Sequence, residues 1–172
     1  MQLIASAGRD EVATANKEMN DASGSMEFLF DFLADTDADG VLDDVDRCKR
    51  LDGPESRSGC PPRLKGEATL RASPTARGIE LLGLTVGATR GARVAVSCSR
   101  GCSRQVKQAA RGAVAFPGLR GRQLPAGSKL VVRVTKRRSI GVYTTYRIQA
   151  GNFKKVERCT NPGSSKPRRR CG

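Results

Sequence analysis

A dense series of aspartates restricts this chain more than any other stretch. Six carboxylates lie within the twelve residues from Asp35 to Asp46. Like charges at this spacing repel one another, so a compact loop is unfavourable unless a cation neutralises it. The alternative is an acidic turn without a ligand, whose charges stay hydrated. The series therefore predicts either a metal-bound loop or a solvated acidic turn.

The spacing of these aspartates favours Ca²⁺, which takes roughly six to eight oxygen ligands. Alternate aspartates at loop positions 1, 3 and 5 can converge on one ion, and Gly40 at position 6 permits a sharp turn. A backbone carbonyl at position 7 and carboxylates at positions 9 and 12 complete the set. The predicted ligands are Asp35, Asp37, Asp39, Val41, Asp43 and Asp46.

The residues after this series do not read as a helix, because Gly53-Pro54 soon follows. A helix–loop–helix calcium site is therefore not expected. The series instead resembles a thrombospondin type 3 repeat, which reads D-x-D-x-D-G-x-x-D-x-x-D-x-C and later G-C-P, as Gly59-Cys60-Pro61 does here. The resemblance covers residues 35–61 and implies an extracellular, calcium-loaded spacer with the same ligands. Lys49 replaces the usual proline and only one repeat is present, so weak binding, roughly 10⁻⁴ to 10⁻³ M, is expected.

The chain reverses its charge near Pro62. There are 14 acidic and 6 basic residues up to Pro62, and 3 acidic and 25 basic residues after it. Such a reversal predicts separate units. We assign residues 1–34 to a linker or the remnant of an upstream domain, residues 35–62 to the calcium loop and residues 63–172 to a basic β module. No signal peptide precedes them, so we interpret the chain as a fragment or one with a misassigned start.

The six cysteines fall into three close pairs: Cys48 with Cys60, Cys98 with Cys102, and Cys159 with Cys171. An even count at close spacing favours disulfides, although other connectivities are formally allowed. Zinc is the alternative, and it is disfavoured because no C-x-x-C motif occurs and the pairs lie in segments of different character. Disulfides imply a compartment outside the cytosol.

Short apolar runs separated by glycine and proline predict strands between residue 67 and about residue 159. The alternating residues are Ala68/Leu70/Ala72, Leu82/Leu84/Val86, Val94/Val96/Cys98, Leu130/Val132/Val134 and Val142/Thr144/Tyr146/Ile148. This spacing predicts a mainly β protein, with a small antiparallel β-sandwich of the immunoglobulin or fibronectin III type after the calcium loop. No apolar run is long enough to span a bilayer.

The basic module contains three distinctive stretches: Leu124-Pro-Ala-Gly-Ser-Lys-Leu-Val-Val-Arg-Val-Thr135, Ile140-Gly-Val-Tyr-Thr-Thr-Tyr-Arg-Ile148, and Cys159-Thr-Asn-Pro-Gly-Ser-Ser-Lys-Pro-Arg-Arg-Arg-Cys171. Together they resemble a C-terminal module that recurs in secreted actinobacterial proteins. The similarity spans about residues 78–171. It implies an extracellular or cell-surface location but no particular activity.

Clusters of basic residues make the module a candidate for binding polyanions. A merely solvated surface is the alternative. Specific nucleic-acid binding is not expected, because the few aromatic residues belong largely to the predicted core. The expected partner is an anionic cell-surface polymer or another surface protein. The candidate residues are Lys136, Arg137, Arg138, Lys154, Lys155, Arg168, Arg169 and Arg170.

The chain contains no histidine, and so lacks the usual general base and the usual activator of a nucleophile. We therefore expect no enzymatic activity. The leading hypothesis is an extracellular calcium-binding spacer and surface-interaction module of the adhesion type. The alternative is a basic module that binds a cell-wall polymer or glycan. Under the first hypothesis, Asp39→Ala should loosen the junction between the two units without unfolding the sandwich.

Overall fold

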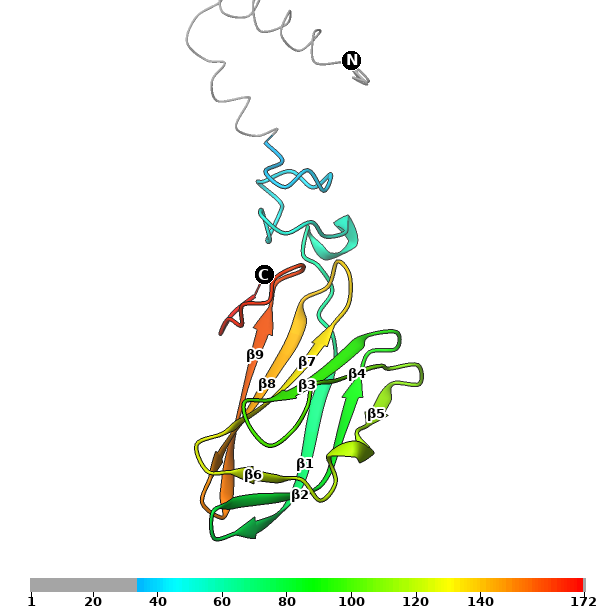
Figure 1. Cartoon of the computed structure of the whole chain (residues 1–172). Helices are drawn as coiled ribbons and strands as arrows, with labels where there is room; N and C mark the ends of the chain where they lie inside the picture. Colours follow the sequence, from blue (N-terminus) through cyan, green and yellow to red (C-terminus); the bar gives the residue numbers. More distant parts are fainter. Residues whose placement is uncertain (1–33, 172) are drawn as a thin grey trace, which may run out of the picture.

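The computed structural model describes residues 34–171, and the predicted upstream linker or domain remnant lies outside them except for Ala34. An acidic segment with one short 3-10 helix, η1 (Glu55–Arg57), precedes the strands (Figure 1). No described helix is long and apolar enough to cross a membrane. The elements that follow are β1 (Gly66–Thr75), β2 (Gly78–Ala88), β3 (Arg93–Cys98), β4 (Gln105–Gln108), β5 (Ala113–Ala115), η2 (Pro117–Leu119), β6 (Gln123–Pro125), β7 (Lys129–Thr135), β8 (Gly141–Gln149) and β9 (Asn152–Thr160).

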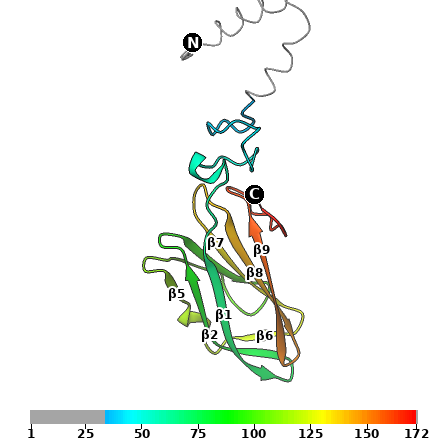
Figure 2. The ribbon, with the colours of Figure 1, turned by 180° about the vertical axis from the view of Figure 1, so that it is seen from behind.

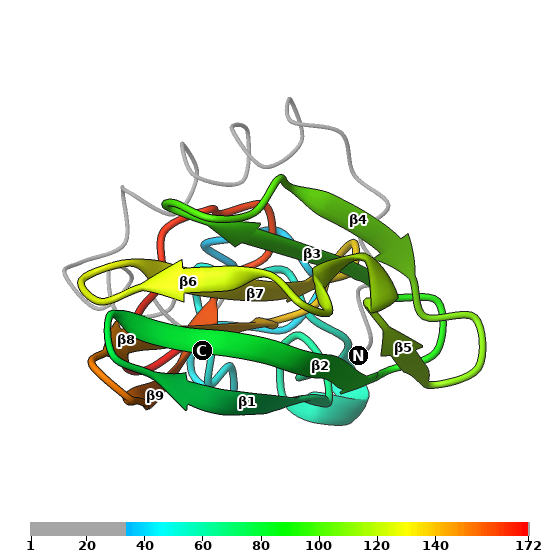
Figure 3. The same cartoon turned by 60° about the horizontal axis from the view of Figure 1, so that its bottom comes forward.

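The strands form two antiparallel sheets. One has the order β4-β3-β7-β8-β9, and in the other β1 pairs with β2, which also pairs with β5 and β6 at its two ends. Figure 3 shows the two layers from the end opposite the acidic segment. The prediction of a mainly β fold with a small antiparallel sandwich is therefore confirmed.

The core lies between the two sheets, where alternate side chains of each strand meet. On β7, Leu130, Val132 and Val134 are at most 1% exposed, whereas their neighbours point to the outer face. Each such side chain contributes about 1.5–3 kcal/mol when it is fully buried. Tyr146 and Phe116 are the largest fully buried side chains of the core.

One predicted core position is wrong. Leu82 was expected to share a face with Leu84, but its side chain is 47% exposed while that of Leu81 is fully buried. The pairing of β1 with β2 shifts by one residue between Arg71 and Ala72, so that Leu82 has no partner on β1. This β-bulge reverses the alternation along β2 and turns Leu82 outward.

All three predicted cysteine pairs are disulfides: Cys48–Cys60, Cys98–Cys102 and Cys159–Cys171. The first closes the acidic segment, the second closes the turn after β3, and the third ties the C-terminal tail to β9. The tail is also held by backbone hydrogen bonds between Cys159 and Arg168, at 2.7 and 3.0 Å.

The acidic segment joins the sandwich at the turn between β7 and β8. Ile140 of this turn exchanges backbone hydrogen bonds of 2.9 Å with Pro62 and Leu64. The Arg138 guanidinium lies 3.6 Å from the Asp52 carboxylate. The Arg63 guanidinium donates a hydrogen bond to the carbonyl of Cys171, so the tail and the acidic segment lie at the same end of the sandwich (Figures 1 and 2).

Candidate functional site

The acidic loop is curled by hydrogen bonds from its own backbone to its aspartates. The Asp35 carboxylate accepts hydrogen bonds from the N–H groups of Asp39, at 3.3 Å, and Gly40, at 2.9 Å. Gly40 has φ +89°, which is a conformation that glycine adopts without steric cost. No α-helix follows Asp46 in the described chain, in agreement with the prediction that this is not a helix–loop–helix site.

This curl brings three of the predicted ligands together. One carboxylate oxygen from each of Asp35, Asp37 and Asp39 lies within 4.8 Å of the other two, a spacing that can hold a metal ion. Asp39 is itself fixed at both oxygens, because Oδ1 accepts from the N–H of Val41 at 2.8 Å and Oδ2 from that of Gly53 at 2.9 Å. The hydrogen bond from Gly53 therefore connects the aspartate loop to the later part of the acidic segment.

Asp37 of this cluster and Asp46 have buried carboxylate oxygens without a partner. Both oxygens of Asp37 are shielded from solvent and accept no hydrogen bond, and the same holds for Oδ2 of Asp46. Asp46 is only 5% exposed, and its Oδ1 accepts from the N–H of Cys48 at 2.6 Å. A buried carboxylate oxygen that lacks a partner is costly, and a bound cation is the group that would best satisfy it.

The electrostatics of the cluster agree with this geometry. Burial raises the pKa of Asp37 above its ordinary value of 3.8. Nearby backbone N–H groups, chiefly that of Leu51, partly offset the rise without completing a hydrogen bond. The negative charges of Asp39 and Asp46 raise this pKa further. Within residues 34–171, none of these carboxylates forms an ion pair with a basic side chain.

Asp43 lies apart from this cluster, although it was also predicted as a ligand. Its carboxylate accepts hydrogen bonds from the N–H of Thr36, at 2.9 Å, and from the Thr36 hydroxyl, at 2.6 Å. These bonds lower the pKa of Asp43. The side chain of Val41 is buried, and the ligand roles of Val41 and Asp43 stay predictions.

Two glycines complete the site and were not identified as functional in the sequence. A Cβ atom at Gly59 would lie 2.0 Å from Oδ1 of Asp46, and one at Gly53 would lie 2.3 Å from the carbonyl oxygen of Gly59. The chain therefore passes against the carboxylate of Asp46 only because these positions lack side chains. The motif Gly59-Cys60-Pro61 was the available signal for one of them.

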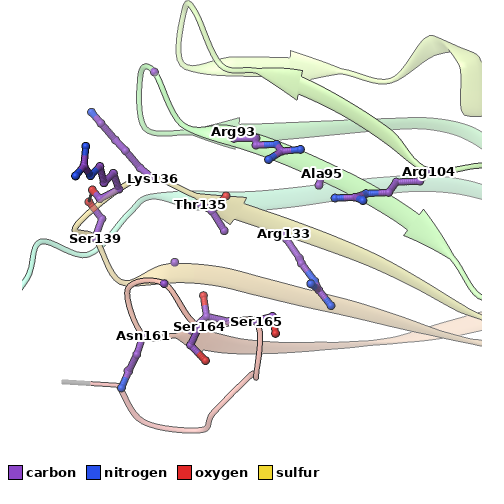
Figure 4. Close-up of a pocket in the computed structure, with 15 residues that line it drawn as sticks. Arg93, Ala95, Arg104, Arg133, Thr135, Lys136, Ser139, Asn161, Ser164 and Ser165 are labelled. Atoms are coloured by element: carbon purple, nitrogen blue, oxygen red, sulfur yellow. Dashed lines mark hydrogen bonds between the residues drawn. The ribbon is translucent and has the colours of Figure 1, made fainter. Parts of the chain in front are cut away.

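A second feature is a cavity of about 610 Å³ over the outer face of the five-stranded sheet (Figure 4). Its cationic lining residues are Arg93, Arg104, Arg133, Lys136 and Arg137. Of the cations predicted to bind polyanions, only Lys136 and Arg137 line it. Arg138 and Lys155 instead pair with Asp52 and Glu157, respectively.

Arg93 of β3, Arg133 of β7 and Arg104, which directly precedes β4, were not predicted as binding residues, although a signal existed for two of them. Arg93 precedes the core residue Val94, and Arg133 lies between core residues of β7, so alternation places both on the outer face. The remaining predicted cations, Lys154 and Arg168 to Arg170, are exposed and do not line the cavity.

Comparisons with protein families, with curated proteins and with solved structures gave no match for this chain.

Proposed function

We propose that this chain is a non-enzymatic, extracellular spacer and surface-interaction module of the adhesion type. In this proposal one Ca²⁺ ion holds the acidic segment, residues 35–62, in a fixed shape. The segment sets the position of the basic sandwich relative to whatever precedes it. The order of the aspartates and of Gly59-Cys60-Pro61, similar to a thrombospondin type 3 repeat, supports this function.

The observation that carries the proposal is the set of buried carboxylate oxygens without partners on Asp37 and Asp46. An acidic turn that merely stays hydrated would leave such oxygens in water. Here they are shielded from solvent, and Asp37 itself belongs to the cluster with Asp35 and Asp39. A cation among these carboxylates would satisfy the orphaned oxygens and remove the repulsion between them.

The chemistry of the donors favours Ca²⁺ over other metals. Every available side-chain donor is a carboxylate oxygen, which suits hard cations, whereas zinc prefers sulfur and nitrogen ligands. Mg²⁺ demands a nearly ideal octahedron and retains several waters, and Ca²⁺ tolerates irregular sets of oxygens. Three disulfides support an oxidising surrounding for the chain, as is found outside the cytosol.

The contacts of Asp39 explain how an ion in the loop would stiffen the junction. Asp39 accepts a hydrogen bond from Gly53, the residue after Asp52, and Asp52 pairs with Arg138 of the β7–β8 turn. That ion pair is exposed and contributes little by itself. Together with the backbone bonds of Ile140, it fixes the end of the segment on the sandwich.

Calorimetric titration of the oxidised protein with Ca²⁺ tests the proposal, with Mg²⁺ as a competing ion. Asp37→Asn removes one charge at an orphaned carboxylate. Asp44→Asn is the matched control, because Asp44 is exposed in the same loop and lies outside the cluster. We expect one saturable site for Ca²⁺, lost in Asp37→Asn and retained in Asp44→Asn. Absence of binding up to several times about 10⁻³ M, or equal losses in both variants, would contradict the proposal.

Asp39→Ala tests whether the acidic segment and the sandwich fold as independent units. We expect this variant to lose calcium binding and to make the acidic segment more susceptible to proteolysis. The thermal melt of the sandwich should change little, since its core contains no residue of the segment before Leu64. A large drop in that melt would show that the two units are not independent.

A further inference from the structure

The cavity over the five-stranded sheet collects positive charge that no residue of the described chain neutralises. The only ion pairs between residues 34 and 171 are Arg138 with Asp52 and Lys155 with Glu157. Neither pair includes a residue that lines the cavity, so the cations of the cavity repel one another without a counter-ion. An unneutralised group of arginines in a concavity focuses its field on an anion.

Arg133 is held in position before any ligand arrives. Its guanidinium lies 5.0 Å from the centre of the Tyr143 ring, above the ring face. It is half-buried on a central strand, between β3 and β8. A guanidinium that is already restrained loses less conformational entropy when it binds an oxyanion, and its planar donors match such groups bidentately.

The opposite side of the cavity has a different character. Arg93, Arg104 and Arg133 come from the sheet side, whereas Ser164 and Ser165 come from the C-terminal tail (Figure 4). The tail is held over this face by the Cys159–Cys171 disulfide. Hydroxyl and amide groups on the tail side suit hydroxyls of a ligand, and the arginines suit its negative charge.

The volume of the cavity and the placement of the aromatic residues restrict the kind of ligand. A cavity of about 610 Å³ is in the range of sites for small organic ligands and exceeds the needs of a bare sulfate or phosphate. Single-stranded nucleic acids require exposed aromatic rings for stacking. Phe116 and Tyr146 are fully buried, and the Tyr143 ring already lies beneath Arg133.

We propose that this cavity binds an anionic polysaccharide through a sugar that carries a sulfate, phosphate or carboxylate group. The arginines of the sheet contact the oxyanion, and the serines of the tail contact the hydroxyls of the ring. The inference rests on the surface-interaction part of the proposed function and supplies its ligand. It does not depend on calcium, so it is tested in EDTA.

The experiment measures binding of a heparin-derived tetrasaccharide, of tetragalacturonate and of uncharged maltotetraose to the oxidised full chain. The heparin fragment presents sulfates and the galacturonate presents carboxylates alone. We expect at least one of these two to bind one site per chain, with an affinity that falls as salt rises. Maltotetraose, inorganic sulfate and a short single-stranded oligonucleotide should each bind at least about tenfold more weakly.

Two double variants with the same change in charge locate the site. Arg93→Gln with Arg133→Gln alters the cavity, and Arg147→Gln with Lys154→Gln alters paired residues of β8 and β9 that lie outside it. We expect the first to weaken binding of the tetrasaccharide by about tenfold or more. The second should change it by no more than about twofold. Both variants should keep the circular dichroism spectrum of the parent.

The possible results separate the site from general attraction. Equal weakening by both double variants would overturn the inference, because net charge alone would then account for binding. Binding of maltotetraose or of inorganic sulfate as tight as that of the anionic sugars would also overturn it. Tighter binding of the oligonucleotide at the same residues would assign the cavity to nucleic acid instead. None of these results bears on the calcium titration, which tests the acidic segment separately.

Discussion

The hydroxyl of Tyr146, on β8, donates a hydrogen bond to the backbone carbonyl of Ala68, on β1. These strands belong to different sheets, so the bond connects the two layers across the core. The ring of Tyr146 is 1% exposed and meets that of Phe153 edge to face, with centroids 5.4 Å apart. One side chain thus contributes both apolar packing and a polar link between the sheets.

Tyr146→Phe should lower the free energy of unfolding by about 1–3 kcal/mol, because it leaves the buried carbonyl of Ala68 without its donor. Urea denaturation of the oxidised protein measures this change. Tyr143→Phe is the control, at a half-buried position on the outer face, and should cost less than about 0.5 kcal/mol. Equal losses in the two variants would contradict a special role for the inter-sheet bond.

The same tyrosine should make stability depend on alkaline pH. Burial raises the pKa of Tyr146 from 10.0 to about 12, and the charges of Glu157 and Glu67 contribute. Between these two pKa values, the Tyr146 hydroxyl therefore keeps its proton in the folded protein and releases it in the unfolded chain. The stabilisation is complete below the unfolded pKa and is lost as pH rises through the folded one.

The expected loss is about 1 kcal/mol by about pH 11, since one pKa unit corresponds to about 1.4 kcal/mol. The difference in unfolding free energy between the parent and Tyr146→Phe isolates this effect from other titrating groups. It should shrink between about pH 8 and about pH 11. A difference that stays constant over this range would mean that the pKa of Tyr146 is not raised.

Removing the Cys48–Cys60 disulfide should weaken calcium binding and leave the sandwich intact. The bridge spans 12 residues and adjoins Asp46, whose carboxylate accepts from the N–H of Cys48. Opening it releases loop entropy equivalent to about 3 kcal/mol. Calorimetry on Cys48→Ser with Cys60→Ser should show a loss of affinity of at least about tenfold. Cys98→Ser with Cys102→Ser is the reciprocal control, which should lower the melt of the sandwich and keep calcium affinity.

Gly59→Ala should abolish calcium binding, chiefly through a steric clash with Asp46. Its Cβ would lie 2.0 Å from Oδ1 of Asp46, and its φ is +71°. Gly40→Ala is the matched comparison, because Gly40 has φ +89° and open space around the added atom. That variant suffers only the backbone strain, about 1 kcal/mol, and should weaken binding by roughly fivefold to tenfold. Equal titrations of the two variants would argue against contact between residue 59 and the carboxylate.

Sequence pattern predicted the strands whose alternation is regular. The alternating residues of β3, β7 and β8 face the core as expected, because one side of each strand meets the opposite sheet. The prediction that Leu82 faces the core failed because of the bulge opposite Arg71 and Ala72. That bulge arises from the pairing of two strands, and the sequence of one strand does not reveal it. β9 was not predicted because it is an edge strand, with Lys154 and Lys155 exposed and no continuous apolar face.

The acidic site was predictable in composition but not in its contacts. The clustering of Asp35, Asp37 and Asp39 follows from alternate spacing around a tight turn. The bond of Asp43 to Thr36 is a local alternative that no spacing rule distinguishes from ligation. The cavity depends on residues 161–165 of the C-terminal tail lining it together with residues of β3 and β7, which is tertiary information that the sequence pattern does not contain.

The hydrogen bond between Arg63 and Cys171 brings the first and last residues of the segment 63–171 into contact. A unit whose two ends lie in contact can be inserted into a surface loop of another protein without distortion of its sheets. For the same reason its ends can be joined by a short linker and new ends made at another turn, which is a circular permutation. New ends would best be placed at the end of the sandwich opposite the acidic segment. There the β1–β2, β6–β7 and β8–β9 turns lie together, with backbone hydrogen bonds from Ala126 to Arg77 and from Gly151 to Gly78. We therefore expect residues 63–171 to tolerate circular permutation, with the new termini in these turns.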